Sequence, residues 1–252
     1  FLVSDRGQRV VERLGLAPNR GAGALGVGDG LDRDQWAEAE FGGAPLGDQR
    51  LSQRLVDSAR AAAEQPGRAF SGVAKADWAT VKGYYRLIDK PDESAVTPEN
   101  ILRPHRERTV RRMKAQKTVL CIQDTTTLDY TGLAQCTGLG PTGTNQTGAS
   151  SRGLDLHSTF AVSPEGIPLG VLHAQCFAPE PRQHDRPNTQ VPIEEKKTFR
   201  WIVGLRDCCE IAREIPHTRL VCVMDREADF FELFDEHRRD PAVDLLVRAK
   251  HD

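Results

Sequence analysis

The sequence of 252 residues has no apolar run of about 18 residues or more, so a transmembrane helix is not expected. No basic segment followed by an apolar one stands near the first residue, Phe1, and no signal peptide is predicted. The six cysteines form no C-x-x-C pair, which argues against a zinc module or a disulfide scaffold and favours buried thiols in a reducing cytoplasm. The composition is typical of a soluble protein with one large or two small domains.

The sequence also lacks an excess of charge of either sign, because its net charge is −2. This near-neutral total conceals an asymmetry between the two halves. Residues 1–117 carry 20 basic and 16 acidic side chains, a net charge of +4, and residues 118–252 have a net charge of −6. The segment 103–117 holds seven basic residues and one acid, Glu107. Such a run fits a polyanionic partner, and the alternative is a solvated helix face.

The first 35 residues are predicted to be a flexible segment. A short helix is expected over 9–16, and Pro18 and several glycines follow it. The stretch 21–26 fits the dinucleotide-binding pattern G-x-G-x-x-G, but neither a hydrophobic strand before it nor a helix after it is predicted. A linker is therefore the better interpretation.

Residues 36–117 are predicted to form a helical domain. Asp48 can cap a helix whose apolar face repeats every three or four residues, at Leu51, Leu55, Ser58 and Ala62. A second helix is expected over Trp78–Ile88, with inward-facing Trp78, Val81, Tyr85 and Ile88. A third helix begins at Thr97-Pro98-Glu99, where a capping residue precedes a proline in the first helical position, and it carries the basic run.

Residues 118–252 have a different pattern, with short β-branched runs. Strands are predicted over 118–123, 156–162, 168–177, 219–224 and 243–247, and helices over 194–213 and 228–237. The segment 124–153 shows no periodicity. The order β-β-β-α-β-α-β predicts an α/β domain with a mixed sheet and helices on both of its faces.

Two aspartates each end an apolar strand, namely Asp124 and Asp225. If the first and fourth predicted strands are neighbours, both carboxylates reach the same crevice beyond the strand ends. Two carboxylates at close range repel each other unless a cation lies between them, and Mg²⁺ is held by one or two carboxylates with water and substrate phosphate. The alternative is that each aspartate caps the next helix or begins a turn.

Other candidate catalytic residues are weaker. His157 and His173 lie in predicted strands and lack the short helical spacing of a zinc pair, so they are interpreted as structural histidines. No G-x-S-x-G motif of a serine hydrolase is present. Cys121 precedes Asp124 by three residues, and strand alternation places it in the core.

The two aspartate segments resemble those of a known family. Residues 121–128, C-I-Q-D-T-T-T-L, are similar to the first-aspartate strand of bacterial cut-and-paste transposases of the DDE type, and residues 223–229, V-M-D-R-E-A-D, to the second. The transposon-five type is the nearest match in this superfamily. Further similarities follow in collinear order over residues 36–252, at 36–37, 41, 46–50, 54–55, 83–88, 151–153, 157–158, 195–196, 201 and 247–251.

This resemblance implies an RNase H-like mixed sheet preceded by a small helical DNA-binding domain. It implies Asp124 and Asp225 as catalytic metal ligands, Mg²⁺ or Mn²⁺ as cofactor, double-stranded transposon-end and target DNA as substrate, and a homodimer in a synaptic complex. A bacterial, nucleoid-associated protein without a membrane span is expected. The residues predicted to contact DNA are basic and lie in both domains: Arg50, Arg54, Arg86, Arg111, Arg112, Arg152, Arg248 and Lys250.

The third carboxylate of the family is the one departure from the pattern. In the family it is a glutamate on a later helix, within a signature of Tyr, Arg, Glu and Lys, and no such set lies between Lys250 and Asp252. Three alternatives remain open: a DDE transposase represented by part of its catalytic core, a catalytically inactive DNA-binding remnant that inhibits transposition, and an unrelated two-metal nuclease.

Overall fold

The computed structural model describes residues 33–64, 77–91, 93–133, 135–144, 150–180 and 190–250. The helix expected over 9–16 and the glycine-rich stretch 21–26 lie outside these ranges. Contacts divide the chain into two units, Phe1–Arg108 and Thr109–Asp252, which we call the helical unit and the sheet unit. The division falls within one helix, α6 (Pro98–Lys114).

The helical unit is built from short amphipathic helices around a small apolar core. Its elements are α2 (Arg33–Phe41), α3 (Gln49–Glu64), α5 (Trp78–Ile88) and the first part of α6 (Pro98–Lys114). A leucine-rich cluster joins them, with Leu51 and Leu55 from α3 and Leu87 from α5 fully or nearly buried. Burial of these side chains is the main stabilising contribution in a unit this small.

The ends of these helices follow their capping residues. Asp48 accepts a hydrogen bond from the backbone N–H of Arg50 (2.8 Å), which confirms its predicted place at the start of α3. Asp77 caps α5 by accepting from the backbone N–H of Ala79 (2.9 Å). Pro98 is the first residue of α6, as predicted, and the Thr97 hydroxyl accepts from the backbone N–H of Asn100 (3.2 Å).

The orientation of α5 differs from the prediction. Val81 and Leu87 are its buried residues, but Trp78, Tyr85 and Ile88 are exposed, with 73% of the Trp78 surface accessible. The prediction assumed that the largest apolar side chains face inward, which is only a tendency. In this helix Val81 and Leu87 face inward, so Trp78 and Tyr85 lie on the outer surface.

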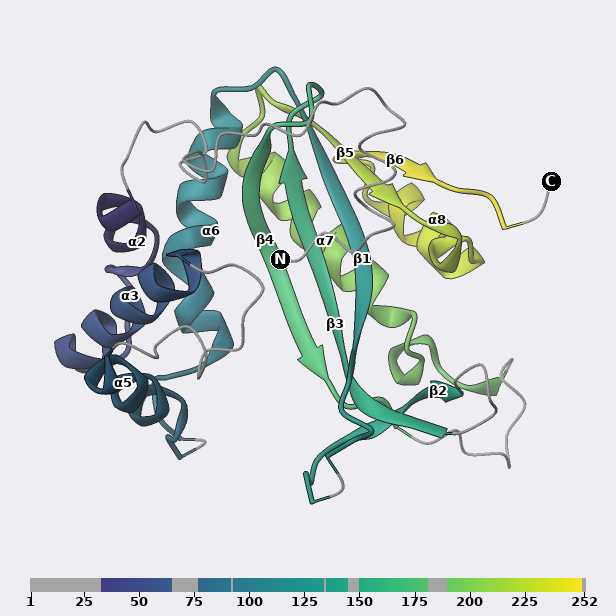
Figure 1. Ribbon diagram of the computed structural model, residues 1–252. Helices are drawn as coiled ribbons and strands as arrows, with labels where there is room; N and C mark the ends of the chain where they lie inside the picture. Colours follow the sequence, from purple (N-terminus) through teal and green to yellow (C-terminus); the bar gives the residue numbers. More distant parts are fainter. Residues whose placement is uncertain are drawn as a thin grey trace. The chain divides into compact units, whose positions relative to one another are not determined.

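The sheet unit contains a mixed sheet of six described strands (Figure 1). They are β1 (Thr118–Asp129), β2 (Gly140–Thr144), β3 (Ser150–Val162), β4 (Pro168–Phe177), β5 (Arg219–Met224) and β6 (Asp244–Val247). The main path runs β4-β3-β1-β5-β6, and β2 pairs with the first residues of β3. β1 is antiparallel to β3 and parallel to β5, and β6 is parallel to β5. This arrangement is compatible with an RNase H-like fold.

The strands extend farther than the sequence analysis predicted. β1 continues from 123 to Asp129 and β3 begins at Ser150, so the segment predicted to lack periodicity contains strand and includes β2. Three consecutive threonines, 125–127, favour extended backbone because they are β-branched. Gly153 permits the close pairing there, since a Cβ atom on it would lie 2.0 Å from the Leu128 carbonyl oxygen.

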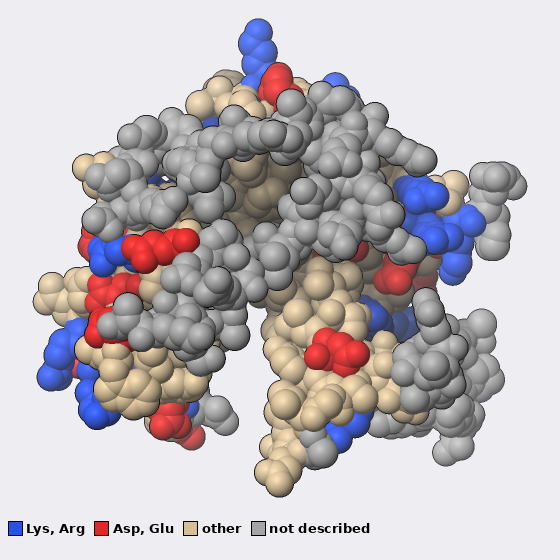
Figure 2. Space-filling model, viewed as in Figure 1, with Lys and Arg blue, Asp and Glu red and all other residues tan. Residues whose placement is uncertain are grey.

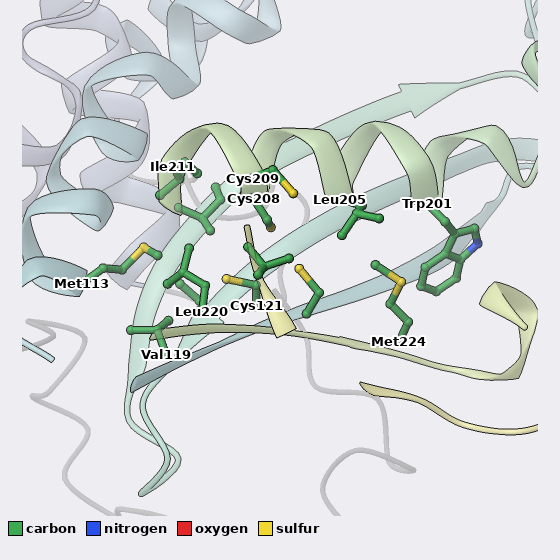
Figure 3. Close-up of a cluster of buried hydrophobic side chains, with 14 of the residues drawn as sticks. Met113, Val119, Cys121, Trp201, Leu205, Cys208, Cys209, Ile211, Leu220 and Met224 are labelled. Atoms are coloured by element: carbon green, nitrogen blue, oxygen red, sulfur yellow. The ribbon is translucent and has the colours of Figure 1, made fainter. Parts of the chain in front are cut away.

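One face of the sheet is covered by helix α7 (Phe199–Glu214), which lies behind the strands in Figure 1. Its stripe of Trp201, Leu205 and Cys208 is buried, as predicted, against strand residues such as Cys121 and Leu220 (Figure 3). The prediction of helices on both faces is wrong for the described residues. Buried side chains from α7, from α8 (Phe231–Arg239) and from the end of α6 all join this one cluster.

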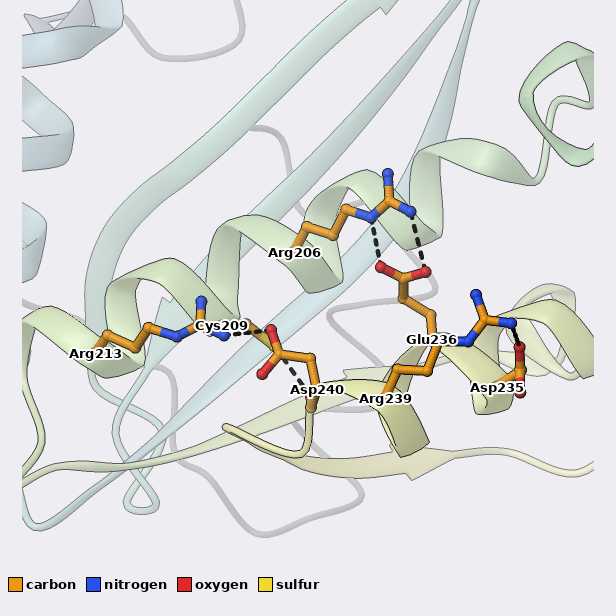
Figure 4. Close-up of polar contacts among 7 residues, drawn as sticks. All are labelled: Arg206, Cys209, Arg213, Asp235, Glu236, Arg239 and Asp240. Atoms are coloured by element: carbon orange, nitrogen blue, oxygen red, sulfur yellow. Dashed lines mark hydrogen bonds and ion pairs between the residues drawn. The ribbon is translucent and has the colours of Figure 1, made fainter.

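Polar contacts fasten α8 to α7 (Figure 4). Arg206 donates to both carboxylate oxygens of Glu236 (2.6 and 3.0 Å), and Arg213 donates to Asp240 (2.5 Å) just after α8 ends. The Cys209 thiol donates to the Asp240 carbonyl oxygen (3.7 Å). Exposed ion pairs contribute at most about 1 kcal/mol each, so their main effect is to set the orientation of α8 on the buried cluster.

Candidate functional site

The two strand-end aspartates lie at the same edge of the sheet. β1 and β5 pair in parallel, with Leu120 opposite Val221 and Ile122 opposite Val223. Asp124 and Asp225 each follow two residues after the last of these pairs. Strand alternation puts both carboxylates on the open face of the sheet, the face opposite α7, because the intervening residues pack under the helix. The neighbouring-strand condition for a shared site is therefore met.

The environment of Asp124 raises the pKa of its carboxyl group. Partial burial is the largest cause and the negative charge of Asp225 adds to it, while the hydrogen bond from the Thr125 backbone N–H (2.8 Å) acts in the opposite direction. Both aspartates extend a pair of neighbouring parallel strands, so the negative charge of each acts on the other. A cation between them would relieve this repulsion.

Asp225 also performs the capping role that was the alternative interpretation. One of its oxygens accepts from the Glu227 backbone N–H (2.8 Å) and so caps the short 3₁₀ helix Arg226–Ala228 (η3). The other oxygen accepts no hydrogen bond from the described residues, and the same is true of the second oxygen of Asp124. Each carboxylate therefore uses only one of its two oxygens for a hydrogen bond, which is compatible with a role as a metal ligand.

The residues fit a hard divalent cation only in part. Mg²⁺ and Mn²⁺ prefer carboxylate oxygens, and two of these converge here without an ion-pair partner among the described residues. Within the described ranges, however, no group of three His, Cys, Asp or Glu side chains is placed to hold a metal ion. Water and substrate phosphate are the ligands that usually complete a two-carboxylate Mg²⁺ site.

His157 and His173 are structural, as the sequence indicated. The His157 ring is fully buried and both of its nitrogens are hydrogen-bonded, one to Thr125 Oγ1 (2.8 Å) and one to Gln123 Oε1 (3.2 Å). Burial, followed by the nearby charges of His173, Arg200 and Lys197, lowers the pKa of His157 to about 4. His173 pairs with Asp207 (2.8 Å). Cys121 is fully buried, which confirms its assignment to the core.

Two of the predicted DNA contacts, Arg248 and Lys250, lie near the Asp225 end of β5, whereas Arg152 lies at the far end of β1, beside Tyr130. Arg152, in β3, is exposed and its guanidinium donates to the Cys136 carbonyl oxygen (3.5 Å). Arg248 follows β6, and its backbone N–H donates to the carbonyl oxygen of Met224, next to Asp225. The backbone N–H of Lys250 donates to Asp229 (2.7 Å). These backbone hydrogen bonds bring Arg248 and Lys250 to the Asp225 end of β5, and both side chains are exposed.

The helical unit contains a shallow hollow of about 390 Å³ between α3 and α5. Its basic lining residues are Arg54, Lys82 and Arg86, and none of them forms an ion pair with the described residues. The two acids of the hollow, Asp57 and Asp77, are engaged by Arg60 and by the α5 N-terminus. The stem of Arg54 passes close to Gly83, where a Cβ would lie 3.6 Å from it. The hollow is thus suited to phosphate groups.

The remaining predicted DNA contacts have different surroundings. Arg50 is exposed but pairs with Asp48 (3.0 Å), which neutralises much of its charge. Arg111 is exposed on α6. Arg112 is half-buried and donates to the Leu169 carbonyl oxygen (2.6 Å), so it supports the fold of the sheet unit. The basic run is therefore distributed around helix α6. On the face of the molecule shown in Figure 2, basic and acidic side chains are interspersed.

Sequence reasoning missed the exposed aromatic side chains of α5. Trp78 and Tyr85 lie seven residues apart, two helical turns on one side of the helix, and Lys82 stands between them. The alternation of aromatic and basic residues at this spacing was visible in the sequence, but the prediction assigned the aromatic side chains to the core. Exposed aromatic and basic side chains together are typical of nucleic-acid surfaces.

Residues 33–92 match the protein-family model described as Transposase DNA-binding. The match spans α2, α3 and α5 and therefore includes the hollow and its three basic residues. It supports a transposase, with DNA as the partner of the helical unit. No described helix is long and apolar enough to cross a membrane.

Proposed function

We propose that this chain is a DNA transposase of the DDE type, which binds transposon-end DNA through the helical unit and cleaves and joins DNA strands at Asp124 and Asp225. The observation that carries the proposal is the combination of a transposase DNA-binding match with a pair of carboxylates on adjacent parallel strands of an RNase H-compatible sheet. We further propose that the protein is bacterial, associates with the nucleoid and acts as a homodimer that holds two transposon ends.

The proposed reaction has two stages. In the first, water attacks a phosphodiester, the bond to the 3′ oxygen breaks, and that oxygen takes up a proton to become a 3′-hydroxyl. In the second, this hydroxyl attacks a phosphodiester of the target strand, so that one phosphodiester forms as another breaks. Bound Mg²⁺ or Mn²⁺ would activate the nucleophile and stabilise the charge on the leaving oxygen.

The residues of this chain contribute orientation and charge to that reaction. The free oxygens of Asp124 and Asp225 would hold the cation, and the hydrogen bonds of their other oxygens fix the direction of each carboxylate. Arg248 and Lys250, exposed beyond β6, would contact the phosphates of a strand at this edge. Trp78 and Tyr85 would contact DNA beside the hollow of the helical unit.

A catalytically inactive DNA-binding protein is the second candidate function. The observation in its favour is that no third acidic side chain joins Asp124 and Asp225 among the described residues. Such a protein would occupy transposon ends through residues 33–92 and thereby inhibit a transposase that uses the same ends.

Calorimetric titration of Mn²⁺ into the full chain tests the metal site. We expect binding by the wild-type protein and none by the Asp124→Asn, Asp225→Asn double variant, because both free oxygens are lost. Asp129→Asn is the matched control, since Asp129 ends the same strand but has its own partner, Thr131. Unchanged binding by the double variant would remove these aspartates from the site, and an absence of wild-type binding would favour the inactive DNA-binding protein.

The salt dependence of DNA binding tests the helical unit. Replacing Arg54 and Arg86 with glutamine should reduce the steepness of log K against log [NaCl] by about 2 for a duplex of arbitrary sequence, because about 0.9 is lost for each phosphate contact. Arg50→Gln is the matched control and should change it less, since Asp48 already pairs with Arg50. Fluorescence anisotropy at several salt concentrations measures these values, and an unchanged steepness in the double variant would exclude the hollow from the DNA interface.

A further inference from the structure

The two residues that flank Asp124 share a single partner. Gln123 and Thr125 project toward α7, on the side of β1 opposite to Asp124, and both contact the ring of His157 in β3. Thr125 Oγ1 lies 2.8 Å from Nδ1, and Gln123 Oε1 lies 3.2 Å from Nε2. One imidazole therefore connects the strand on both sides of Asp124 to the neighbouring strand.

This imidazole is held rigidly. His157 is 0% exposed, and the edge of its ring meets Trp201 of α7 with 4.8 Å between ring centroids. The Gln123 side chain is 2% exposed and fits against Gly204, where a Cβ would lie 2.4 Å from Gln123 Oε1. The absence of a side chain at Gly204 thus lets the Gln123 amide pack directly against helix α7.

The hydrogen-bonding capacity of a neutral imidazole matches its two partners. With the Gln123 amide oxygen facing the ring, the matching tautomer has the proton on Nε2, because an amide oxygen can only accept. Nδ1 is then an acceptor and receives the Thr125 hydroxyl proton. Both ring nitrogens are then satisfied, whereas the buried Gln123 amide nitrogen makes no hydrogen bond with the described residues.

We propose that His157 is a positioning residue that orients Asp124 by fixing the β1 backbone on either side of it; this rests on the function proposed above. Side chains alternate between the two faces of a strand. Because Gln123 and Thr125 are anchored on one face, the Asp124 side chain between them has a defined direction on the other. Asp225 has no comparable anchor among the described residues and is fixed by its contact with the Glu227 backbone N–H. A network of side chains therefore orients the carboxylate of Asp124, and a helix cap orients that of Asp225.

Two single variants and one matched control test this role in the full chain. Thr125→Val removes the hydroxyl with little change in shape, and His157→Asn keeps an acceptor near the Nδ1 position but loses the contact with Gln123. Thr127→Val is the control, because the Thr127 hydroxyl makes a hydrogen bond of similar length (2.9 Å) on the same strand face, but to Asp155. Mn²⁺ binding by calorimetry and hydrogen–deuterium exchange of the 122–128 backbone are measured for each.

We expect Thr125→Val and His157→Asn to weaken Mn²⁺ binding by about tenfold, the scale found when the groups that orient a metal ligand are removed. Exchange over 122–128 should become roughly fivefold faster relative to 219–224, as for the loss of one hydrogen bond. Thr127→Val should leave the Mn²⁺ affinity close to wild type.

Each result decides the proposal. Folded variants with wild-type Mn²⁺ affinity and wild-type exchange would overturn it, as would an equal loss of affinity in Thr127→Val. If His157→Asn fails to fold, Thr125→Val alone decides, since Thr125 is only half-buried. If the wild-type protein binds no Mn²⁺, the proposed metal site fails, and the exchange data then uphold or overturn the positioning role independently.

Discussion

The two faces of the sheet use the same strands for different purposes. On the covered face, Leu220 and Cys222 of β5 pack with Leu205 of α7, and all three are almost completely buried. On the open face, a row of apolar side chains crosses four strands in register, and two of its members are exposed, Ile122 at 37% and Leu246 at 59%. The carboxylates of Asp124 and Asp225 follow directly after this row.

This difference shows how a small domain can present exposed carboxylates without weakening its core. The covered face supplies the apolar burial and also the polar anchor of β1, through His157 and Gln123. The open face supplies the carboxylates, which in the proposed function would need access to water and substrate. Strand alternation separates the two roles by a single residue, so neighbours in the sequence have opposite surroundings.

The largest expected effect comes from a cavity in the covered face. Leu205→Ala should reduce the free energy of unfolding by about 2–5 kcal/mol, because Leu205 is 1% exposed and packed on all sides. Leu246→Ala is the matched control on the open face and should cost well under 1 kcal/mol. Urea unfolding of the sheet unit, followed by Trp201 fluorescence with Trp36 and Trp78 replaced by phenylalanine, measures both. Equal losses would contradict the contrast between the faces.

A somewhat smaller effect is expected from the protonation of His157. The folded pKa of about 4 lies below the ordinary value of 6.5, so below pH 6.5 the unfolded chain binds a proton that the folded one does not. Stability from this group is complete above pH 6.5 and is lost as the pH falls toward 4, by about 2–3 kcal/mol at pH 4.5.

The same fluorescence assay isolates this contribution. Between pH 7 and pH 4.5, the free energy of unfolding should fall by about 2–3 kcal/mol less in His157→Gln than in the wild type. The carboxylates that titrate in this range are common to both proteins, so their contribution cancels in the comparison. An identical pH dependence in the two proteins would mean that the buried ring is not kept neutral by the fold.

Much of the fold could be predicted from local patterns. β4, β5 and α5 have the predicted bounds, since each is a short run with a clear period and clear ends. The length of β1 and the existence of β2 could not be predicted, because threonine- and glycine-rich strands gain their stability from pairing with β3. The outward aromatic side chains of α5 were also missed, since hydrophobicity alone does not tell a buried residue from an exposed one.

The sequence by itself determined that two aspartates end apolar strands, that Cys121 and Asp124 face opposite ways, and that Asp48 and Pro98 begin helices. These features depend on residues a few positions apart, whose geometry is fixed by the backbone period. Only the tertiary structure decided that β1 and β5 are neighbours, and that His157 lies against residues 32 and 34 positions earlier in the chain. Such contacts are selected by the packing of the whole sheet against α7, because no local interaction favours one strand order over another.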